Sequence, residues 1–326
     1  MNRLKHKILD EVKEDLEGIE TALRENLSPH FDLVREIASH ILFSGGKRLR
    51  PLLTVLCARL CGYAGNYDKT FSIIFEYLHA ATLLHDDLID DARLRRGKPA
   101  AHSVWDNSTA VLTGDFLLAR ALSIGTETGS LKIIRIVSEI TENMSQGEIR
   151  QLMRKGNLNL SESEYMDIIR CKTAVLIQGA CRVGSLIADA GEKEESALSD
   201  YGFNLGIAFQ MADDLLDYTS DSSVLGKEVG ADLKEGKLTL PVICSLTTAN
   251  SKERSDMEKI IKNKAFSVEE FETLVKMLRT CGGLRYTEQL AEKYVERAKD
   301  ALSVFDPSKT KEILLNIADY ALSREA

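Results

Sequence analysis

The long interval without proline is the feature that most constrains the fold of this chain. No proline occurs between Pro99 and Pro241. The interval is rich in Leu, Ala, Ile, Glu and Lys, and its apolar residues recur at spacings of three and four, as they do along one face of an α-helix. No sustained alternation of apolar and polar residues indicates a sheet. The sequence therefore predicts helix after helix, and an all-α fold.

The domain organisation follows from what does not interrupt the chain. Its 326 residues would by length alone suggest about two domains. However, no Pro/Gly/Ser-rich linker and no block of like charge divides them. With 44% hydrophobic and 28% charged residues, the composition is that of a globular chain with a large core. We expect one all-α domain over residues 1–326.

Charge and cysteine usage exclude several classes of protein. A formal net charge of −8 argues against a nucleic-acid-binding surface, which needs a basic stripe. The six cysteines lie mostly in apolar helical patterns without a CxxC or Cys/His cluster, as in a reduced intracellular protein. The N-terminal segment is acidic and lacks the apolar core of a signal peptide, and no apolar run is long enough to span a bilayer. We expect a cytoplasmic protein without a membrane span.

The pattern Asp-Asp-x-x-Asp occurs twice, at residues 86–90 and 213–217, each time after an apolar, helix-patterned run. Positions i and i+4 share a helix face, so Asp86 and Asp90 point the same way. Carboxylates packed that closely repel each other unless cations neutralise them, and their oxygens suit Mg²⁺. One such triplet would be weak, because acidic triplets are common on solvated helix faces. Two copies beside buried runs predict a site that binds a phosphorylated substrate through several Mg²⁺ ions.

Basic residues occur in the sequence both before and after the first Asp motif. The pattern predicts a helix over residues 31–43 that ends at a Gly-Gly pair, followed by Lys47 and Arg50 in a short loop before Pro51 opens the next helix. An Arg-rich cluster at residues 93–98 follows the first Asp motif. Such groups suit phosphate oxygens. Loop cations are more often simply solvated, and a basic cluster beside acids can be mere charge balance, so both interpretations stay open.

Other polar residues are individually weaker signals. His79 precedes Asp86 by seven residues, two helical turns along the same face, although a lone histidine there is more often a core residue. Lys172 and Thr173 open an apolar helix, and Gln210 shares a face with the second motif. The Gly- and Lys-rich residues 221–241 are either an ordinary surface loop or a mobile lid that carries two lysines over a phosphate site.

Together these segments resemble the successive motifs of the trans-isoprenyl diphosphate synthases, also called polyprenyl synthetases. The matching segments, in the family's order, are residues 45–51, 83–97, 172–173, 210–217 and 226–241. The resemblance implies an all-α fold of roughly a dozen helices around a deep central cavity, as a homodimer. It also implies Mg²⁺-dependent, head-to-tail addition of isopentenyl diphosphate to an allylic diphosphate such as farnesyl diphosphate.

The resemblance also implies roles for single residues. The metal ions would be held by Asp86, Asp90 and Asp213, with supporting roles for Asp87, Asp214 and Asp217. The isopentenyl diphosphate site would be formed by Lys47, Arg50, His79 and Arg96. The groups around the allylic substrate would be Arg95, Lys172, Thr173, Gln210, Lys227 and Lys237. Of these, Lys172 and Lys227 would act in catalysis together with the three metal-binding carboxylates.

Product length in this family depends partly on residues just before the first Asp motif. Here the fifth and fourth residues upstream are Ala81 and Thr82. Short-chain members tend to place a bulky aromatic there, so a small Ala81 resembles the medium- and long-chain, octaprenyl-type members. The floor of the cavity would then come from a deeper helix, within residues 111–125 or 131–144. A farnesyl or geranylgeranyl diphosphate synthase is the main alternative.

Two more distant alternatives remain. A terpene cyclase also ionises allylic diphosphates at such a motif, but its second metal motif usually mixes Asn, Ser or Thr with acids. The regulatory subunit of a two-component synthase typically lacks the Asp motifs. This chain keeps both motifs intact, which favours a catalytic synthase.

Overall fold

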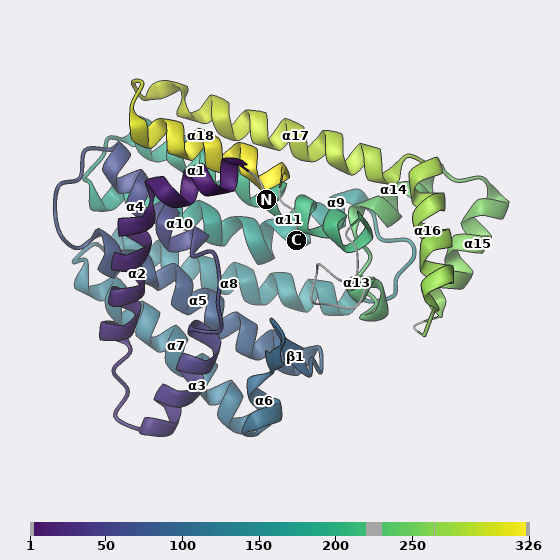
Figure 1. Ribbon diagram of the computed structural model, residues 1–326, viewed down its shortest axis with the longest axis horizontal. Coiled ribbons are helices and arrows are strands. Elements are labelled where there is room, and N and C mark those ends of the chain that lie inside the picture. The colour runs from purple at the N-terminus through teal and green to yellow at the C-terminus, as the bar shows by residue number, and fades with distance from the viewer. Residues whose placement is uncertain (1–2, 220–229, 264, 324–326) are drawn as a thin grey trace.

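The computed structural model describes residues 3–219, 230–263 and 265–323, and over these residues the chain is all-α (Figure 1), as predicted. The first elements are α1 (Arg3–Glu11), α2 (Lys13–Asn26), α3 (Asp32–Leu42), α4 (Leu49–Leu60), α5 (Asp68–Ile89), β1 (Leu94–Arg95), β2 (Lys98–Pro99), α6 (Ala101–Val104), α7 (Asn107–Glu127) and α8 (Leu131–Arg154). The others are α9 (Glu162–Ile169), the π-helix η1 (Arg170–Ala174), α10 (Val175–Ile187), α11 (Glu192–Thr219), α13 (Ala231–Lys234), α14 (Leu240–Thr248), α15 (Ser251–Lys262), α16 (Val268–Thr280), α17 (Gly283–Ala301), the 3₁₀-helix η2 (Leu302–Val304) and α18 (Lys309–Leu322).

The helix that carries the first Asp motif lies in the centre of the molecule. α5 is apolar on nearly every side, so it packs against α4, α7 and α2 rather than facing solvent. Its side chains Phe75 and Tyr77 are fully buried, and the Tyr77 hydroxyl donates to the Leu23 carbonyl oxygen at 2.9 Å. The rigid surroundings of α5 therefore fix the position of the motif at its C-terminal end.

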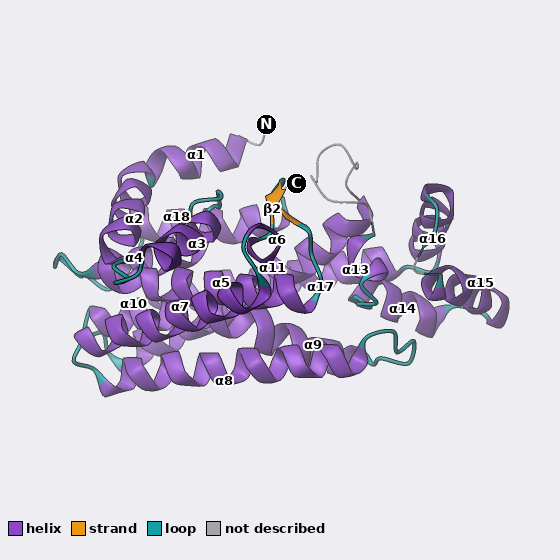
Figure 2. Ribbon diagram, turned by 90° about the horizontal axis from the view of Figure 1, so that it is seen from below, coloured by secondary structure: helices purple, strands orange, loops and turns teal. Residues whose placement is uncertain are grey.

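The second Asp motif lies near the end of the longest helix, α11, which packs against α10 and α17. A second apolar cluster extends from there over α14, α15 and α16, which project beyond the rest of the bundle at the right of Figure 1. The first and last described helices, α1 and α18, pack against each other (Figure 2). There Lys7 Nζ donates to Glu312 Oε1 at 2.6 Å.

Local details near the motifs differ from the expected pattern. The helix predicted over residues 31–43 is confirmed as α3, but α4 begins at Leu49, so Arg50 lies in its first turn rather than in the loop. The first turn tolerates Pro51 because its N–H groups lack helical partners in any case. After the first motif, the chain forms a small antiparallel hairpin, β1–β2, whose turn has positive φ at Arg96 and Gly97.

The sequence pattern predicted that Lys172 and Thr173 open a helix, and this prediction is wrong. They lie in η1, where the helix that begins as α9 widens by one residue per turn and continues into α10. Such π-helical turns are often found at functional sites. Helix α8 approaches this turn closely at Gly147, where an added Cβ would come within 2.8 Å of Cys171 Cβ. Within the described ranges, no helix has the length and apolar character needed to cross a bilayer.

Candidate active site

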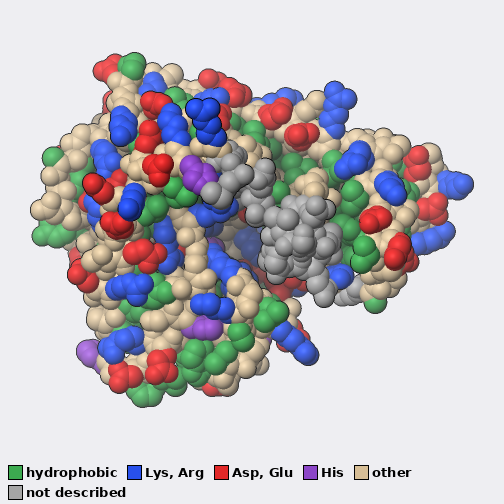
Figure 3. Space-filling model, viewed as in Figure 1, with side chains coloured by type: hydrophobic (Ala, Val, Ile, Leu, Met, Phe, Trp, Pro, Cys, Tyr) green, Lys and Arg blue, Asp and Glu red, His purple; other side chains and the backbone are tan. Residues whose placement is uncertain are grey.

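A cavity of about 420 Å³ lies between the two motif helices, and residues of both predicted substrate sites line it. Its charged residues Asp86, Glu148 and Lys172 contact one another where α5 meets η1, and this region is the polar end of the cavity. Its apolar wall is formed by Leu78, Leu83, Ile89, Leu118, Met144, Ile149, Leu152, Leu176 and Phe209. In the space-filling view the surface is hollowed in the middle of the visible face, and Lys and Arg side chains lie at the wall of the hollow (Figure 3).

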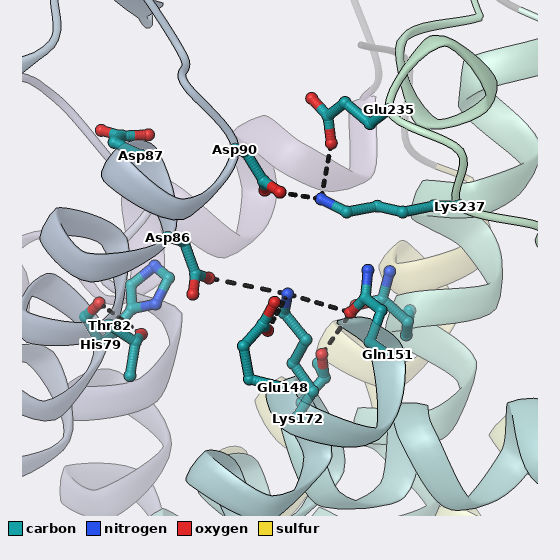
Figure 4. A network of polar contacts seen from close by, with 12 residues as sticks. His79, Thr82, Asp86, Asp87, Asp90, Glu148, Gln151, Lys172, Glu235 and Lys237 are labelled. Carbon is teal, nitrogen blue, oxygen red and sulfur yellow. Dashed lines mark hydrogen bonds and ion pairs between the residues drawn. The ribbon is translucent and has the colours of Figure 1, made fainter. Parts of the chain in front are cut away.

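Asp86, the first carboxylate of the first motif, faces Lys172 of η1 (Figure 4). Lys172 Nζ lies 3.7 Å from Asp86 Oδ2, donates to Gln151 Oε1 at 3.1 Å, and forms a closer ion pair with Glu148. Burial raises the pKa of Asp86 to about 6; Lys172 opposes this shift, and Glu148 and Asp90 add to it. Lys172 thus faces two carboxylates, Asp86 and Glu148, and can neutralise the charge of only one. Because negative charge is left over, this end of the cavity favours further cations.

Asp90, at the C-terminal end of α5, is held by two lysines. Its Oδ1 accepts a hydrogen bond from Lys155 Nζ at 2.8 Å, and its Oδ2 accepts one from Lys237 Nζ at 2.7 Å. Lys237 also pairs with Glu235 at 2.6 Å (Figure 4). Burial acts to raise the pKa of Asp90, but the hydrogen bonds from both lysines outweigh it and lower the pKa. Asp90 is therefore ionised and oriented.

The middle acid of the first motif points to the other side of α5 (Figure 4). Asp87 is 2% exposed, and its Oδ1 accepts a hydrogen bond from Arg95 Nε at 2.6 Å. Arg95, which the resemblance assigned to the allylic substrate, therefore neutralises Asp87 in this structure and is not among the cavity-lining residues. The pair anchors the β1–β2 hairpin to α5.

The second motif uses its acids differently. Asp213 is exposed and lines the cavity opposite Asp86. Asp214 is 2% exposed and accepts hydrogen bonds from the Tyr165 hydroxyl at 2.5 Å and from Gln210 Nε2 at 2.8 Å. Burial raises the pKa of Asp214 well above its usual range. Asp217 Oδ1 accepts from the Ala231 N–H at 3.2 Å, which ties α11 to the start of α13.

Thr173 and Gln210, both assigned to the allylic substrate, are joined to this buried acid. The Thr173 hydroxyl donates to Gln210 Oε1 at 2.7 Å, and the other end of the same amide donates to Asp214. Both residues line the cavity. Because its amide oxygen and nitrogen are both engaged, the orientation of Gln210 is fixed before any ligand binds.

Arg50, His79 and Arg96 form a cluster of hydrogen-bond donors beside the cavity. Arg50 and His79 line it, and the Arg96 guanidinium lies against Gly46, where an added Cβ would come within 2.9 Å of Nη1. Burial lowers the pKa of His79, and Arg50 and Arg96 lower it further; burial also lowers the pKa of Arg50 despite nearby Glu76. The buried Nε of Arg50 has no hydrogen-bond partner among the described residues. Such a surplus of donors suits an anion with several oxygens.

The remaining predicted site residues are placed less directly. Lys47 is exposed and lies over the Tyr320 ring, with Nζ 5.6 Å from the ring centre, in a groove beside α1 rather than in the cavity. Lys227 lies outside the described residues. Thr82 lines the cavity, whereas Ala81 is fully buried and is not among its lining residues. Ala81 would have to influence product length through its neighbours.

Three polar residues at the site were missed by the sequence analysis: Glu148, Gln151 and Lys155 of α8 and its C-terminal end. A signal for them exists. Together with Met144, which lines the cavity, they recur at spacings of four, three and four, so they continue the same stripe of α8 toward its C-terminus. An apolar stripe that turns polar along its length indicates a cavity with a polar end.

The acids fit a metal ion that arrives together with its phosphate ligand. Among the described residues, no three His, Cys, Asp or Glu side chains are grouped closely enough to hold a metal ion by themselves. Asp86 and Asp90 lie one helical turn apart on one side of the site, and Asp213 lines the other side. Mg²⁺ typically takes only one or two carboxylates and fills its other positions with water and phosphate oxygens. The donor set therefore fits Mg²⁺ on a diphosphate.

Comparison with known proteins decides the family. The model of the family described as polyprenyl synthetase matches residues 31–278, which include both Asp motifs. The chain belongs to the polyprenyl synthetase family. It is accordingly a trans-prenyltransferase of the prenyl diphosphate synthase class.

Individual polyprenyl synthetases match nearly the whole chain. Octaprenyl diphosphate synthase of Escherichia coli (strain K12) is 37% identical over 319 residues, 98% of each chain. The crystal structure of polyprenyl synthase from Caulobacter crescentus CB15, complexed with calcium and isoprenyl diphosphate, is 38% identical and matches with a TM-score of 0.92 over 98% of each chain. Heptaprenyl diphosphate synthase component 2 of Bacillus subtilis (strain 168) is 34% identical over 314 residues, 96% of this chain and 89% of its own.

The names of relatives span several product lengths. Proteins 34–35% identical to this chain are named as nonaprenyl, heptaprenyl and geranylgeranyl diphosphate synthases. Arguments about the product of this polyprenyl synthetase have to come from its own cavity.

Proposed function

We propose that this polyprenyl synthetase adds isopentenyl diphosphate head-to-tail to farnesyl diphosphate in a Mg²⁺-dependent reaction, and makes a medium- or long-chain, octaprenyl-like product. The observation that carries the proposal is the meeting of two motif helices at the polar end of one apolar cavity. There Asp86 and Asp213 line the cavity beside Lys172, and Asp90 faces Lys237.

The reaction begins with breakage of the allylic C–O bond, which leaves negative charge on diphosphate and positive charge on carbon. Asp86, Asp90 and Asp213 are the residues that would hold Mg²⁺, which would supply charge neutralisation for the departing diphosphate. Lys172 and Lys237 add fixed positive charge beside the same carboxylates. Preorganised charge of this kind is often the largest contribution to rate enhancement.

The second substrate binds at the cluster of hydrogen-bond donors. Arg50, His79 and Arg96 are the donors proposed for the diphosphate of isopentenyl diphosphate. Arg50 and His79 line the cavity, and both arginines lie close enough to His79 to lower its pKa. The alkene then attacks the allylic carbocation, and we expect released diphosphate to take the proton. The apolar wall, including Leu78 and Leu83, excludes water that would quench the carbocation.

The shape of the cavity supports a long product. Past Thr82 the wall continues to Leu118 of α7 and to Thr141 and Met144 of α8, the two helices from which a floor was expected. Of the described residues that line the cavity, only Phe209 is a Phe, Tyr or Trp, and it neighbours Gln210 at the polar end. No large ring closes the path beyond Thr82 among them, which favours the long-chain over the short-chain alternative.

We further propose that the enzyme acts in the cytoplasm as a homodimer. All six cysteines are free thiols, which suits a reducing compartment. Helices α7 and α8 leave large apolar side chains exposed that do not line the cavity: Leu112 at 65% and Met153 at 76%. Exposed apolar groups of this size favour a protein partner. The likeness to a protein named as component 2 makes a heteromeric synthase the second candidate, and light scattering on the purified chain, with activity measured in parallel, separates the two.

The experiment that tests the function is a product assay with Mg²⁺, isopentenyl diphosphate and farnesyl diphosphate, with chain length read by mass spectrometry after dephosphorylation. A ladder that ends in a long polyprenol supports the full proposal. A product one unit longer than farnesyl keeps the chemistry and rejects the long chain. If the folded protein does not elongate farnesyl diphosphate, the proposed activity is rejected. The terpene cyclase and the non-catalytic subunit of a two-component synthase then become the favoured alternatives.

A further inference from the structure

Lys155 lies just beyond the C-terminal end of α8, opposite the last acid of the first Asp motif. Its Nζ donates to Asp90 Oδ1 at 2.8 Å, and its side chain is 26% exposed while that of Asp90 is 10% exposed. Among the described residues, Asp90 is the one carboxylate within ion-pair distance of Lys155. The contact is therefore a specific, largely buried pair rather than one of several exchangeable surface contacts.

The backbone around Lys155 fixes this approach. Gly156, at φ 75°, follows it, and the Gly156 N–H donates to the Gly236 carbonyl oxygen at 2.8 Å. Gly236 directly precedes Lys237. The two lysines that share Asp90 thus come from two turns that are hydrogen-bonded to each other, and they approach the carboxylate as one unit.

Space for a further anion lies beside these lysines. A cavity of about 200 Å³ is lined by Lys155, Lys172 and Lys237 together, next to the cavity that receives the allylic chain. Acids also border it, since Asp214 and Asp232 lie in its wall. Lys172 lines both cavities, so an anion gripped at their junction is within reach of all three lysines.

The partners of the lysines differ once Asp90 is taken by a cation. Lys237 keeps Glu235 at 2.6 Å, and Lys172 keeps Glu148 and Gln151. Lys155 loses its one carboxylate among the described residues. A largely buried ammonium without a partner is unfavourable, whereas phosphate oxygens are strong partners for it.

We propose that Lys155 is a further substrate-binding residue that pairs with Asp90 in the ligand-free enzyme and binds diphosphate oxygens of the allylic substrate when Asp90 binds metal. The inference rests on the proposed function. Lys155 thereby keeps Asp90 oriented before binding and adds a third lysine to the departing diphosphate.

The test is a calorimetric titration of inorganic diphosphate with Mg²⁺ into the wild type, Lys155→Met, Lys155→Arg and Arg170→Met. Lys155→Met keeps the aliphatic stem and removes the charge, and we expect its Kd to rise roughly ten- to hundredfold, as for the loss of a charge-assisted hydrogen bond. Lys155→Arg should retain most of the affinity. Arg170→Met is the matched control, because Arg170 pairs with the exposed Asp167 at 3.5 Å and does not line either cavity.

Steady-state kinetics supply the second measurement. For Lys155→Met we expect the KM for farnesyl diphosphate to rise by a similar factor, with the KM for isopentenyl diphosphate unchanged. An unchanged or tighter Kd for diphosphate in Lys155→Met overturns the inference, since Lys155 would then only compete with the metal. A wild type that neither binds diphosphate with Mg²⁺ nor elongates farnesyl diphosphate instead overturns the proposed function.

Asp90 keeps Lys237 in these variants, so no carboxylate is left unpaired and we expect normal folding. Melting curves check this. Where Lys155→Met is unfolded, Lys155→Gln gives the same comparison with a neutral polar side chain.

Discussion

In the first Asp motif two carboxylates, Asp86 and Asp90, pair with lysines that line the two cavities. In the second motif Asp214 and Asp217 accept hydrogen bonds from neutral groups of the fold, and Asp213 is the acid that lines the larger cavity. The five-residue pattern is the same in both. The difference therefore comes from what surrounds each helix, and it teaches that spacing fixes which acids share a face but not which partners meet that face.

The surroundings differ in a simple way. α5 ends at Ile89, so Asp90 follows the last helical residue and meets lysines from two neighbouring turns. α11 continues to Thr219, past its motif, and there Tyr165 and the start of α13 supply neutral O–H and N–H donors. Charged partners leave the first motif ready to exchange lysines for metal, and neutral donors make the second motif part of the scaffold.

The largest effect that tests this comparison is on turnover. We expect Asp86→Ala to lower kcat by about a hundred- to thousandfold or more, because it removes a proposed metal ligand at the departing diphosphate. The protein should remain folded, since Asp86 is a buried acid whose charged form is disfavoured. Asp91→Asn is the control: Asp91 is exposed at φ 51°, a conformation that Asn tolerates. Near-normal turnover of Asp86→Ala would remove it from the metal site.

The next largest effect is expected on product length. It is tested by substituting the residue that stands four positions before each motif. Thr82 precedes Asp86 and lies on the cavity wall, so Thr82→Phe should block the path and shorten the product by several isoprene units. Phe209 precedes Asp213 but lies at the polar end, so Phe209→Leu should leave the length unchanged. Mass spectrometry of the dephosphorylated products reads both.

Ala81→Phe sharpens this prediction from the neighbouring position. Because Ala81 is fully buried and off the cavity wall, we expect a smaller change in product length and a lower melting temperature from overpacking. A shorter product from Ala81→Phe than from Thr82→Phe would contradict the placement of the two side chains.

A third effect concerns stability and belongs to the second motif. Asp214→Ala removes the acceptor of the buried Tyr165 hydroxyl and of the half-buried Gln210 amide. Leaving buried donors unpaired costs about 1–3 kcal/mol, so the melting temperature should fall by a few degrees. Asp213→Ala, at the exposed neighbouring position, should melt close to wild type while losing activity. Equal melting temperatures of the two variants would contradict the assignment of Asp214 to stability and of Asp213 to activity.

The parts of this site that the sequence could predict are those set by helical spacing and by motif order. The all-α fold, the common face of Asp86 and Asp90, and the placement of Arg50 and His79 on one cavity follow from such patterns. The partners could not be predicted, because they come from residues far along the chain. Lys155 reaches Asp90 over 65 positions and Lys237 over 147. The π-helical turn at Lys172 was also missed, since its one extra residue leaves an apolar helical pattern nearly unchanged.

The smallest effect lies within the first motif itself, where two acids one turn apart should change stability with opposite sign. The pKa of Asp86 is raised to about 6, so its ionised form destabilises the metal-free fold at pH 7. This penalty shrinks as the pH falls below 6 and is lost near pH 3.8, where the carboxyl of the unfolded chain is protonated too. The pKa of Asp90 is lowered by its lysines, so its ionised form stabilises the fold at pH 7, and that contribution persists at pH 5.

In a chelator-containing buffer at pH 7, we therefore expect Asp86→Asn to melt about one or two degrees above wild type and Asp90→Asn about as far below it. On lowering the pH to 5, the excess of Asp86→Asn should shrink, because the wild-type carboxyl becomes neutral like the amide. The deficit of Asp90→Asn should remain, because Asp90 is still ionised and paired with Lys155 and Lys237. If both variants instead melted above wild type at pH 7, or both below it, the lysines would not stabilise Asp90 more than Asp86 as the geometry indicates. The difference in the roles of the acids would then lie between the two motifs and not between Asp86 and Asp90.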